Sequence, residues 1–327
     1  MIGICTAVTY QSESHYFGRN LDYECSYGES VTVTPRNFPF IFKKMERVHS
    51  HYAMIGMAHI SGGYPLYYDA TNEKGLSMAG LNFPDNAVYH PMVEGKKNLA
   101  PYELMVWLLG NCATVEEVKT ELKDVNVVKI SFSEELPLTP LHWMIADKKE
   151  VITVETTKDG LQVYSNPVGV LTNNPPFPEQ MFSLNQYPYL TNREANDKFC
   201  EQIPVSQYSR GLGGLGLPGD LSSQSRFVRG AFCKLYAVSE KEELASVHQF
   251  FHILGSVEQQ RGCVCLDKGV YELTIYSSCC NTDLGIYYYT GYENRQITAV
   301  DMHRVNLDGE HLVSYPFRKQ GQIHWQN

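Results

Sequence analysis

The sequence predicts an α+β protein in which mainly antiparallel sheets are covered by helices. Candidate strands follow one another as hairpins, and hairpins build antiparallel sheets. Helical segments form two blocks between blocks of strands, an order typical of layered α+β domains. The chain has 327 residues, of which 43% are hydrophobic and 19% charged. This composition is that of a globular protein, and two sheets packed face to face with helices outside would bury its apolar surface.

The N-terminal part of the chain reads as short strands. A polar turn at residues 11–14 separates two apolar segments, which is a hairpin pattern. A Ser-Val-Thr-Val-Thr segment then alternates with a period of two residues, as a half-buried strand does. We therefore expect strands over residues 4–10, 15–19, 30–34, 51–57 and 76–82.

Two helices are expected next. The first covers residues 101–110, because Pro101 suits a first helical turn and apolar residues follow at helical spacing. The second begins at the capping-box sequence of residues 114–117 and extends to about Val125.

The rest of the chain repeats the order of strands, helices and strands. Asp159-Gly160 joins two apolar segments and is a strong signal for a tight hairpin. We find no internal repeat, low-complexity tract or linker, so we expect one domain over residues 1–327, with residues 1–4 as a removable leader. The expected strands are 141–146, 151–156, 161–165, 271–278, 285–290 and 296–302, and the expected helices are 225–238 and 242–254.

Composition argues against several classes of partner. The formal net charge is −9 and no basic block occurs, so nucleic acid and anionic membrane surfaces are poor candidates. No apolar run approaches the length of about 18 residues that spans a membrane, and no export signal is visible. The nine cysteines are an odd number, so we expect reduced thiols and a cytoplasmic location. The Cys263-x-Cys265 and Cys279-Cys280 pairs lack zinc-site spacing and a nearby histidine, so we expect no metal and no cofactor.

Cys5 is the most informative residue. It stands at the head of a strand-like run, behind a four-residue leader. A chain cut before Cys5 would carry a thiol and a free α-amine on one residue, which is a nucleophile with its own base. The two groups titrate near pH 8.5 and about 7.7–8.0, close to working pH. The alternative is core packing, because cysteine is among the most buried residue types.

Charged and amide side chains are placed to serve that nucleophile. Arg19 and Asp22 lie on the return strand of the first hairpin, where a guanidinium would lower the thiol pKa and a carboxylate would hold the α-amine. Asn82 and Asn173 end two apolar strands, where a side-chain amide can donate to a developing oxyanion. Each of these four residues, taken alone, also has an ordinary structural explanation. Arg19 and Asp22 could be a surface charge and a turn former, and asparagine is common at strand ends and in turns.

Arg226 lies in the first turn of an expected helix, behind serines that suit an N-cap. A cation there opposes the helix dipole, so we expect an anion or a catalytic carboxylate to compensate it. The preceding Gly-Leu-Gly-Gly-Leu-Gly segment, residues 211–216, matches the G-x-G-x-x-G pattern of nucleotide-binding loops. No strand leads into it and Pro218 follows it, so we interpret it as a loop.

An ordered set of short segments resembles the bile salt hydrolases (choloylglycine hydrolases) of gut bacteria. The match runs nearly end to end. The segments are Cys5-Thr6-Ala7, Phe17-Gly18-Arg19-Asn20-Leu21-Asp22, Thr34-Pro35-Arg36-Asn37, Asn72-Glu73-Lys74-Gly75, Ala79-Gly80-Leu81-Asn82-Phe83, Leu141-His142-Trp143, Gly169-Val170-Leu171-Thr172-Asn173, Leu217-Pro218-Gly219-Asp220 through Ser225-Arg226-Phe227, Tyr276-Ser277-Ser278-Cys279 and Ile297-Thr298-Ala299-Val300-Asp301.

The resemblance implies a four-layer αββα sandwich of the N-terminal-nucleophile hydrolase type, a homotetramer and no cofactor. It implies that a mature N-terminal cysteine hydrolyses the amide between a bile acid and glycine or taurine, through a thioester acyl-enzyme. Motif by motif, the family's nucleophile falls on Cys5, the arginine near its thiol on Arg19, the partner of its α-amine on Asp22, its oxyanion or substrate-polarising amides on Asn82 and Asn173, and its second active-site arginine on Arg226.

The leader departs from the family pattern, in which the cysteine usually follows the initiator methionine. Here activity requires a break between Ile4 and Cys5, and we expect the thiol to catalyse it. The steroid body needs an apolar cleft, for which we expect Leu21, Phe132, Leu136 and the loop around residues 59–63 to supply the wall.

Two alternative functions stay open at this point. A penicillin V acylase would use the same machinery on a smaller aromatic acyl group, although Asn82 favours bile salts because the acylases often carry tyrosine there. A protein that binds amphiphiles without turnover would result if the leader were retained and covered Cys5.

Overall fold

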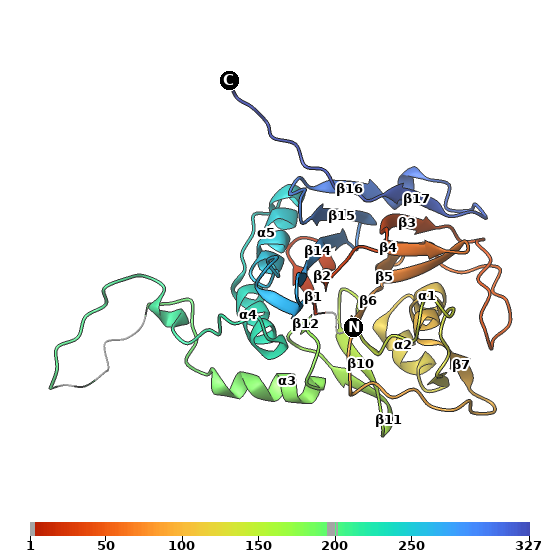
Figure 1. Cartoon of the computed structure of the whole chain (residues 1–327), viewed down its shortest axis with the longest axis horizontal. Helices are drawn as coiled ribbons and strands as arrows, with labels where there is room; N and C mark the ends of the chain where they lie inside the picture. Colours follow the sequence, from red (N-terminus) through yellow and green to blue (C-terminus); the bar gives the residue numbers. More distant parts are fainter. Residues whose placement is uncertain (1–3, 195–199, 201) are drawn as a thin grey trace.

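The computed structural model describes residues 4–194, 200 and 202–327. Two large sheets stack on each other, and helices cover their outer faces (Figure 1). This is the α+β sandwich expected from the sequence, with antiparallel pairing throughout both large sheets. Among the described residues, no helix is long and apolar enough to cross a membrane.

The first sheet carries the N-terminal hairpin at its centre. Its strand order is β12-β1-β2-β14-β15-β16, with β13 paired to β14. Segments from both ends of the chain therefore lie side by side, because β2 pairs directly with β14. The strands are β1 (Cys5–Gln11), β2 (His15–Tyr23), β12 (Val170–Leu171), β13 (Val264–Asp267), β14 (Val270–Asn281), β15 (Ile286–Gly291) and β16 (Thr298–Asp301).

The second sheet has the order β11-β10-β9-β6-β5-β4-β3-β17. Its inner face packs on the first sheet, where Ile55, Ala79 and Met144 join Ala7 and Leu21 in one buried core. The strands are β3 (Ser30–Thr34), β4 (Met54–Ser61), β5 (Tyr64–Asn72), β6 (Ser77–Asn82), β9 (Leu141–Ala146), β10 (Val151–Thr157), β11 (Gly160–Ser165) and β17 (Val313–Pro316).

Helices close the sandwich on both outer faces. On the outer face of the second sheet, α1 packs on β5 and β6. Leu104 and Leu108 of this helix belong to a second apolar cluster, together with Met78 and Ile145 of the sheet. On the first sheet, α4 packs on β1 and α5 packs on β14. The helices are α1 (Pro101–Asn111), α2 (Val115–Glu121), α3 (Phe177–Ser183), α4 (Ser223–Tyr236) and α5 (Glu243–Gly255), with short 3-10 turns at Leu184–Gln186, Leu212–Gly214 and Met302–Arg304.

Most expected elements are present, with shifted ends. The helix expected to reach Val125 ends at Glu121, because residues 125–127 form β8 (Val125–Val127), which pairs in parallel with β7 (Lys97–Leu99). The strand expected at 51–57 starts at Met54. The sequence did not predict α3, whose Pro178 is tolerated because it lies in the first helical turn.

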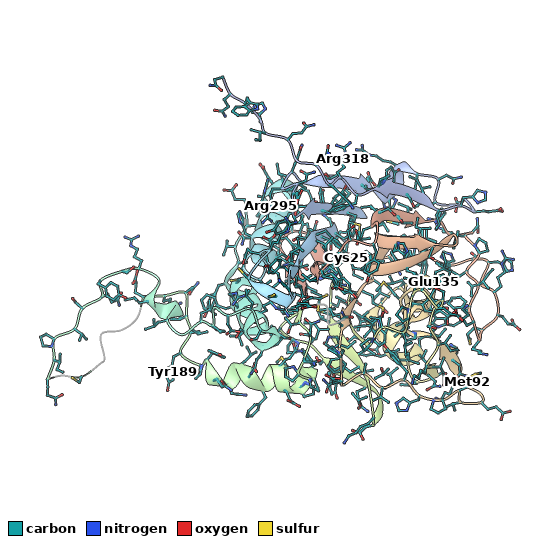
Figure 2. The ribbon with its side chains drawn as sticks, in the orientation of Figure 1. Cys25, Met92, Glu135, Tyr189, Arg295 and Arg318 are labelled. Atoms are coloured by element: carbon teal, nitrogen blue, oxygen red, sulfur yellow. The ribbon has the colours of Figure 1, made fainter. Side chains whose placement is uncertain are left out.

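The described part of the segment between α3 and α4 projects away from the body of the molecule (Figure 1). It carries large exposed side chains: Tyr189, labelled in Figure 2, is 91% exposed and Tyr208 is 88% exposed. The glycine-rich part of this arm contains only a 3-10 turn at Leu212–Gly214, in agreement with its interpretation as a loop.

Candidate active site

Cys5 is the first residue of β1 and pairs with Leu21 on β2. The side chain is almost fully buried, with 2% exposed, and it lines a cavity between the two sheets. Burial raises the pKa of the Cys5 thiol, and the charges of Arg19 and Arg226 oppose this shift. Burial therefore disfavours the thiolate in this site, and the nearby positive charges offset part of that effect.

Arg19 crosses the space between the sheets. It stands two residues before Leu21 on β2, and its Nη1 donates to the backbone oxygens of Tyr68 at 3.0 Å and Gly80 at 2.5 Å, both in the second sheet. Its side chain is buried and lines the same cavity as Cys5. Its Nη2 is buried with no partner in the described residues, which leaves one strong donor for a ligand.

Asn173 binds the backbone nitrogen of Cys5. The N–H of Cys5 donates to Asn173 Oδ1 at 2.8 Å, and the Asn173 Nδ2 donates to the backbone oxygen of Asn82 at 2.8 Å. We expected this side chain to donate to the substrate. Its oxygen instead lies on the nitrogen that becomes the α-amine if the chain is cut before Cys5.

Arg226 connects Asn173 to the first strand. Its Nη2 donates to Asn173 Oδ1 at 2.9 Å, and its Nη1 donates to the Cys5 backbone oxygen and to Thr6 Oγ1, each at 2.6 Å. Its side chain is fully buried in the first turn of α4, behind the N-cap Ser222. Burial lowers the pKa of Arg226, and the negative groups Asp22, Cys5 and Glu272 counteract this effect. The carboxylates expected to compensate this cation are therefore nearby.

Asp22 follows Leu21 on β2 and is not among the described residues that line the cavity. Its backbone N–H donates to the Ile4 oxygen at 3.0 Å, and its Oδ1 accepts the Thr274 hydroxyl at 2.6 Å. The other carboxylate oxygen is buried with no partner in the described residues. Burial raises the pKa of Asp22 to about 6, although the charge of Arg226 opposes the shift.

Asn82 ends β6 at the wall of the cavity and is 7% exposed. In the part of the chain that the structure describes, no hydrogen bond uses its side-chain amide. The amide is thus available to donate to a carbonyl group placed beside Cys5.

The cavity has a volume of about 260 Å³ and is mainly apolar. Of the residues expected in the cleft wall, Leu21, Phe132, Leu136 and His59 line this cavity, whereas residues 60–63 are not among its lining residues. Figure 2 marks Glu135, an exposed residue that also belongs to the lining. Sequence reasoning missed most of the aromatic wall, which lies on four separate segments: Tyr23, Tyr27, Tyr67, Tyr68, Tyr102 and Trp143.

Glu272 on β14 is a second residue that sequence reasoning missed. Its side chain is fully buried, and its Oε1 accepts the N–H of Ile4. Burial raises the pKa of Glu272 to about 8, with Asp22 adding to the shift and Arg226 opposing it. The available signal was a carboxylate inside the otherwise apolar strand segment Tyr-Glu-Leu-Thr-Ile.

We predict a pH effect on the stability of the chain with residues 1–4 in place, studied as the Cys5→Ala variant. The folded state keeps the Glu272 proton up to about pH 8, whereas the unfolded chain releases it near 4.5. The folded state thus binds more protons between these values, so the free energy of unfolding falls as pH rises. The slope attributable to Glu272 is at most about 1.4 kcal/mol per pH unit.

Urea unfolding of Cys5→Ala and of Cys5→Ala/Glu272→Gln between about pH 6.5 and 8.5 measures this contribution, because the second variant lacks the titrating group. The double variant is expected to have the flatter profile. Equal slopes for the two variants would contradict the prediction.

Comparison with known proteins identifies the class of this site. The family model of linear amide C–N hydrolases, choloylglycine hydrolase family, matches residues 5–315. The chain therefore belongs to the choloylglycine hydrolase family and is an enzyme that hydrolyses linear amide C–N bonds, as the sequence motifs predicted.

Relatives match over their full length. The chain is 55% identical over 324 residues to the bile salt hydrolase/transferase of Lactiplantibacillus plantarum, covering 99% of this chain and 100% of the relative. It is 40% identical over 329 residues to the bile salt hydrolase/transferase of Clostridium perfringens, with coverage of 99% and 100%.

Solved structures confirm the fold. The crystal structure of a mutant of the conjugated bile acid hydrolase from Clostridium perfringens superposes with a TM-score of 0.92 at 40% identity, over 99% of this chain and 100% of that chain. Penicillin V acylase from Agrobacterium tumefaciens shares the fold, with a TM-score of 0.74 at 20% identity over 95% and 90% of the two chains.

Proposed function

We propose that this enzyme hydrolyses the amide bond that joins a bile acid to glycine or taurine, with Cys5 as an N-terminal nucleophile. The observation that carries the proposal is the position of Cys5, whose thiol lines the apolar cavity while its backbone nitrogen lies on Asn173. The names of the relatives support the substrate class, because they are bile salt hydrolases. A cut between Ile4 and Cys5 supplies the α-amine.

The first half of the reaction follows from the positions of these groups. The α-amine takes the thiol proton and the sulfur attacks the amide carbonyl carbon of the substrate. The Asn82 side chain, which makes no hydrogen bond to another described residue, donates to the oxyanion. The α-ammonium then protonates the leaving glycine or taurine nitrogen, and a thioester between Cys5 and the bile acid remains.

The second half resolves the thioester. Water attacks its carbonyl carbon after giving a proton to the same α-amine, and the thiol leaves with a proton. Asn173 Oδ1 orients the amine throughout, since it is held in place by Arg226 Nη2. Arg19 Nη2 favours the thiolate through its charge, and Asp22 offers its partnerless oxygen to the α-ammonium.

The cavity suits an amphiphile better than a small polar substrate. Aromatic and aliphatic side chains form most of its wall and can pack on a steroid body. Among the lining residues that the structure describes, Arg19 is the one with a permanent positive charge, which suits a substrate whose charged end lies near the thiol.

A paired assay tests the proposal. Purified enzyme is incubated with a glycine-conjugated bile salt, a taurine-conjugated bile salt and penicillin V, and the released amine or acid is quantified. Faster hydrolysis of either bile salt supports the proposal. Faster hydrolysis of penicillin V would replace it with the acylase function.

We predict that Asn82→Ala lowers kcat by roughly 10²–10³-fold, the usual effect of removing one oxyanion donor. Asn82 makes no side-chain hydrogen bond to the described residues, so its loss is expected to leave the melting temperature nearly unchanged. Asn86→Ala is a control in the loop that follows β6. Wild-type turnover by the Asn82 variant would remove this residue from the mechanism.

We also propose a homotetramer in the cytoplasm. The projecting arm between α3 and α4 supports association, because its residues Tyr189, Tyr208 and Leu215 expose large side chains, as does Phe182 at the end of α3. All nine cysteines are free thiols, as a reducing compartment requires. Light scattering of the purified enzyme is expected to give the mass of four chains, and the mass of a single chain would contradict the assembly.

A further inference from the structure

A buried histidine connects the two strand ends that carry Asn82 and Asn173. His142 lies on β9 in the second sheet and has no exposed surface. Its ring stacks on the ring of Phe83, with centroids 4.3 Å apart and planes 5° from parallel, and its Nε2 donates to the backbone oxygen of Thr172 at 2.8 Å. Since Phe83 follows Asn82 and Thr172 precedes Asn173, one imidazole contacts the chain neighbours of both amides.

Glu155 fixes the orientation of this ring. It lies opposite His142 on β10, is also fully buried, and places Oε1 at 3.1 Å from His142 Nδ1. The Thr172 oxygen can only accept a hydrogen bond, so Nε2 carries a proton. Two lone pairs do not face each other at this distance, so a second proton lies between Nδ1 and Oε1. With both ring nitrogens held, the imidazole has one orientation.

The two side chains attach both ends of a single segment to the second sheet. His142 binds the oxygen of Thr172, directly after β12 of the first sheet, and Glu155 Oε1 accepts the N–H of Phe177 at 2.9 Å, where α3 begins. Asn173 lies between these two attachments. Its Nδ2 reaches across to the Asn82 oxygen at 2.8 Å, so the separation of the two sheets at this point sets the spacing of the two amides.

Another buried histidine offers a direct comparison. His51 is 7% exposed, its Nδ1 and Nε2 bind the backbone oxygens of Tyr52 and Phe38 at 2.7 and 3.0 Å, and its ring centroid lies 4.8 Å from that of Phe40. It therefore makes the same kinds of contact as His142, but to parts of the chain that carry neither a candidate catalytic residue nor a residue of the cavity wall.

We propose that His142 and Glu155 are positioning residues, which hold the Asn82 amide and Asn173 Oδ1 at the spacing that the reaction on Cys5 requires. His142 and Glu155 are not among the described residues that line the cavity, so they act through the two asparagines and not on the substrate. This inference rests on the proposed function, in which Asn82 binds the oxyanion and Asn173 orients the α-amine.

The test compares kcat and KM for bile salt hydrolysis in chains that begin at Cys5, produced behind a protease site so that every chain has the α-amine. His142→Phe keeps an aromatic ring against Phe83 but lacks the donor to Thr172. We expect its kcat to fall by about 10²-fold, the usual effect of a displacement of about 1 Å. KM should change by less than about threefold, because uniform substrate binding is untouched. His142→Gln places an amide nitrogen near the position of Nε2 and is expected to have a kcat at least about tenfold above that of His142→Phe.

His51→Phe is the matched control. Both phenylalanine variants lose buried hydrogen bonds and should unfold at lower urea concentration than the unsubstituted chain. The kcat per folded molecule should nevertheless stay unchanged in His51→Phe, which separates positioning from a general loss of stability.

Several results would overturn the positioning role. These are an unchanged kcat in His142→Phe, an equal loss of kcat in His51→Phe, and a glutamine variant at residue 142 that is no faster than the phenylalanine variant. If His142→Phe does not fold, Glu155→Leu and Glu155→Gln replace it. Leucine removes both hydrogen bonds of the carboxyl group, whereas the glutamine amide can donate to Nδ1 and accept the Phe177 N–H, so we expect the glutamine variant to be the faster by about tenfold or more and equal rates to overturn the role. An unsubstituted chain that begins at Cys5 and does not hydrolyse bile salts would instead overturn the proposed function.

Discussion

A Cys5→Ala chain is expected to have no measurable bile salt hydrolysis and to retain residues 1–4. The thiol is the nucleophile of the proposed hydrolysis and of the expected cut before Cys5, and removal of a catalytic nucleophile typically lowers kcat by on the order of 10⁴-fold or more. The fold should survive, because alanine fits a site that already sits at the start of β1 among core residues. Product release and intact mass measured on one preparation check both parts of the prediction.

The control is a second free cysteine away from the cavity. Cys233 lies on α4 and is half-buried, and Cys233→Ser is expected to process and hydrolyse as the unsubstituted chain does. A Cys5→Ala chain with appreciable turnover would refute the nucleophile. A fully active preparation that keeps residues 1–4 would refute the need for a free α-amine.

The α-amine can be tested apart from the thiol. A short chain with one glycine added before Cys5 keeps the sulfur but replaces the amine by a peptide nitrogen, which is not a base. Hydrolysis is expected to fall by about 10²–10⁴-fold, the usual contribution of general acid–base catalysis. Labelling of Cys5 by a thiol reagent in the same sample would show that the sulfur remains accessible.

Residues close in sequence to Cys5 were the easiest part of the site to predict. Arg19 and Asp22 follow a hairpin turn, and antiparallel pairing returns the chain beside its start, so Cys5 lies opposite Leu21. The structure places both side chains around Cys5 as expected. Asn82 and Asn173 were recognised as amides at strand ends, but only the three-dimensional arrangement distinguishes the one that faces the cavity from the one that accepts the Cys5 N–H.

Long-range pairing explains what the sequence did not predict. Glu272 reaches Ile4 because β14 joins β2, and a register shift between Thr274 and Tyr276 alters which side chains face the hairpin. No local pattern encodes that pairing. The aromatic wall of the cavity was not predicted for the same reason. Tyr68, Tyr102 and Trp143 come from separate elements, and the hydrophobic pattern of each element predicts which residues are buried but not that they share a cavity.

For Arg226, the sequence predicted the need for charge compensation but not the hydrogen-bond partners. A cation in the first turn of a helix predicted a compensating negative group, and the carboxyl group of Asp22, whose charge favours the charged form of Arg226, fulfils this expectation. The hydrogen bonds of the guanidinium are nevertheless with neutral oxygens of Cys5, Thr6, Asn173 and Leu221. The planar guanidinium group of Arg226 therefore orients Cys5 in addition to balancing charge. The helix-dipole argument predicts only the charge balance.

Replacing this arginine is expected to have the second large effect. Arg226→Met removes the charge that most favours ionised Asp22 and frees Asn173 to move, so we predict a loss of about 3–5 kcal/mol in stability. A displacement of the amine by about 1 Å costs roughly 10²-fold in rate, so kcat should fall at least that far in the molecules that remain folded. Arg226→Lys keeps the charge but cannot bridge three oxygens, and it should recover stability more than rate.

Arg229→Met on the same helix separates these effects from the general cost of removing an arginine. Arg229 is half-buried and donates to the backbone oxygens of Ser256, Pro218 and Asp220, none of which contacts Cys5. We expect it to lower the urea midpoint while leaving kcat and the pH profile of the folded enzyme unchanged. If Arg226→Lys had the same kcat as the unsubstituted enzyme, a single positive charge would suffice at this position. The argument that the guanidinium group orients Asn173 toward the reacting nitrogen would then fail.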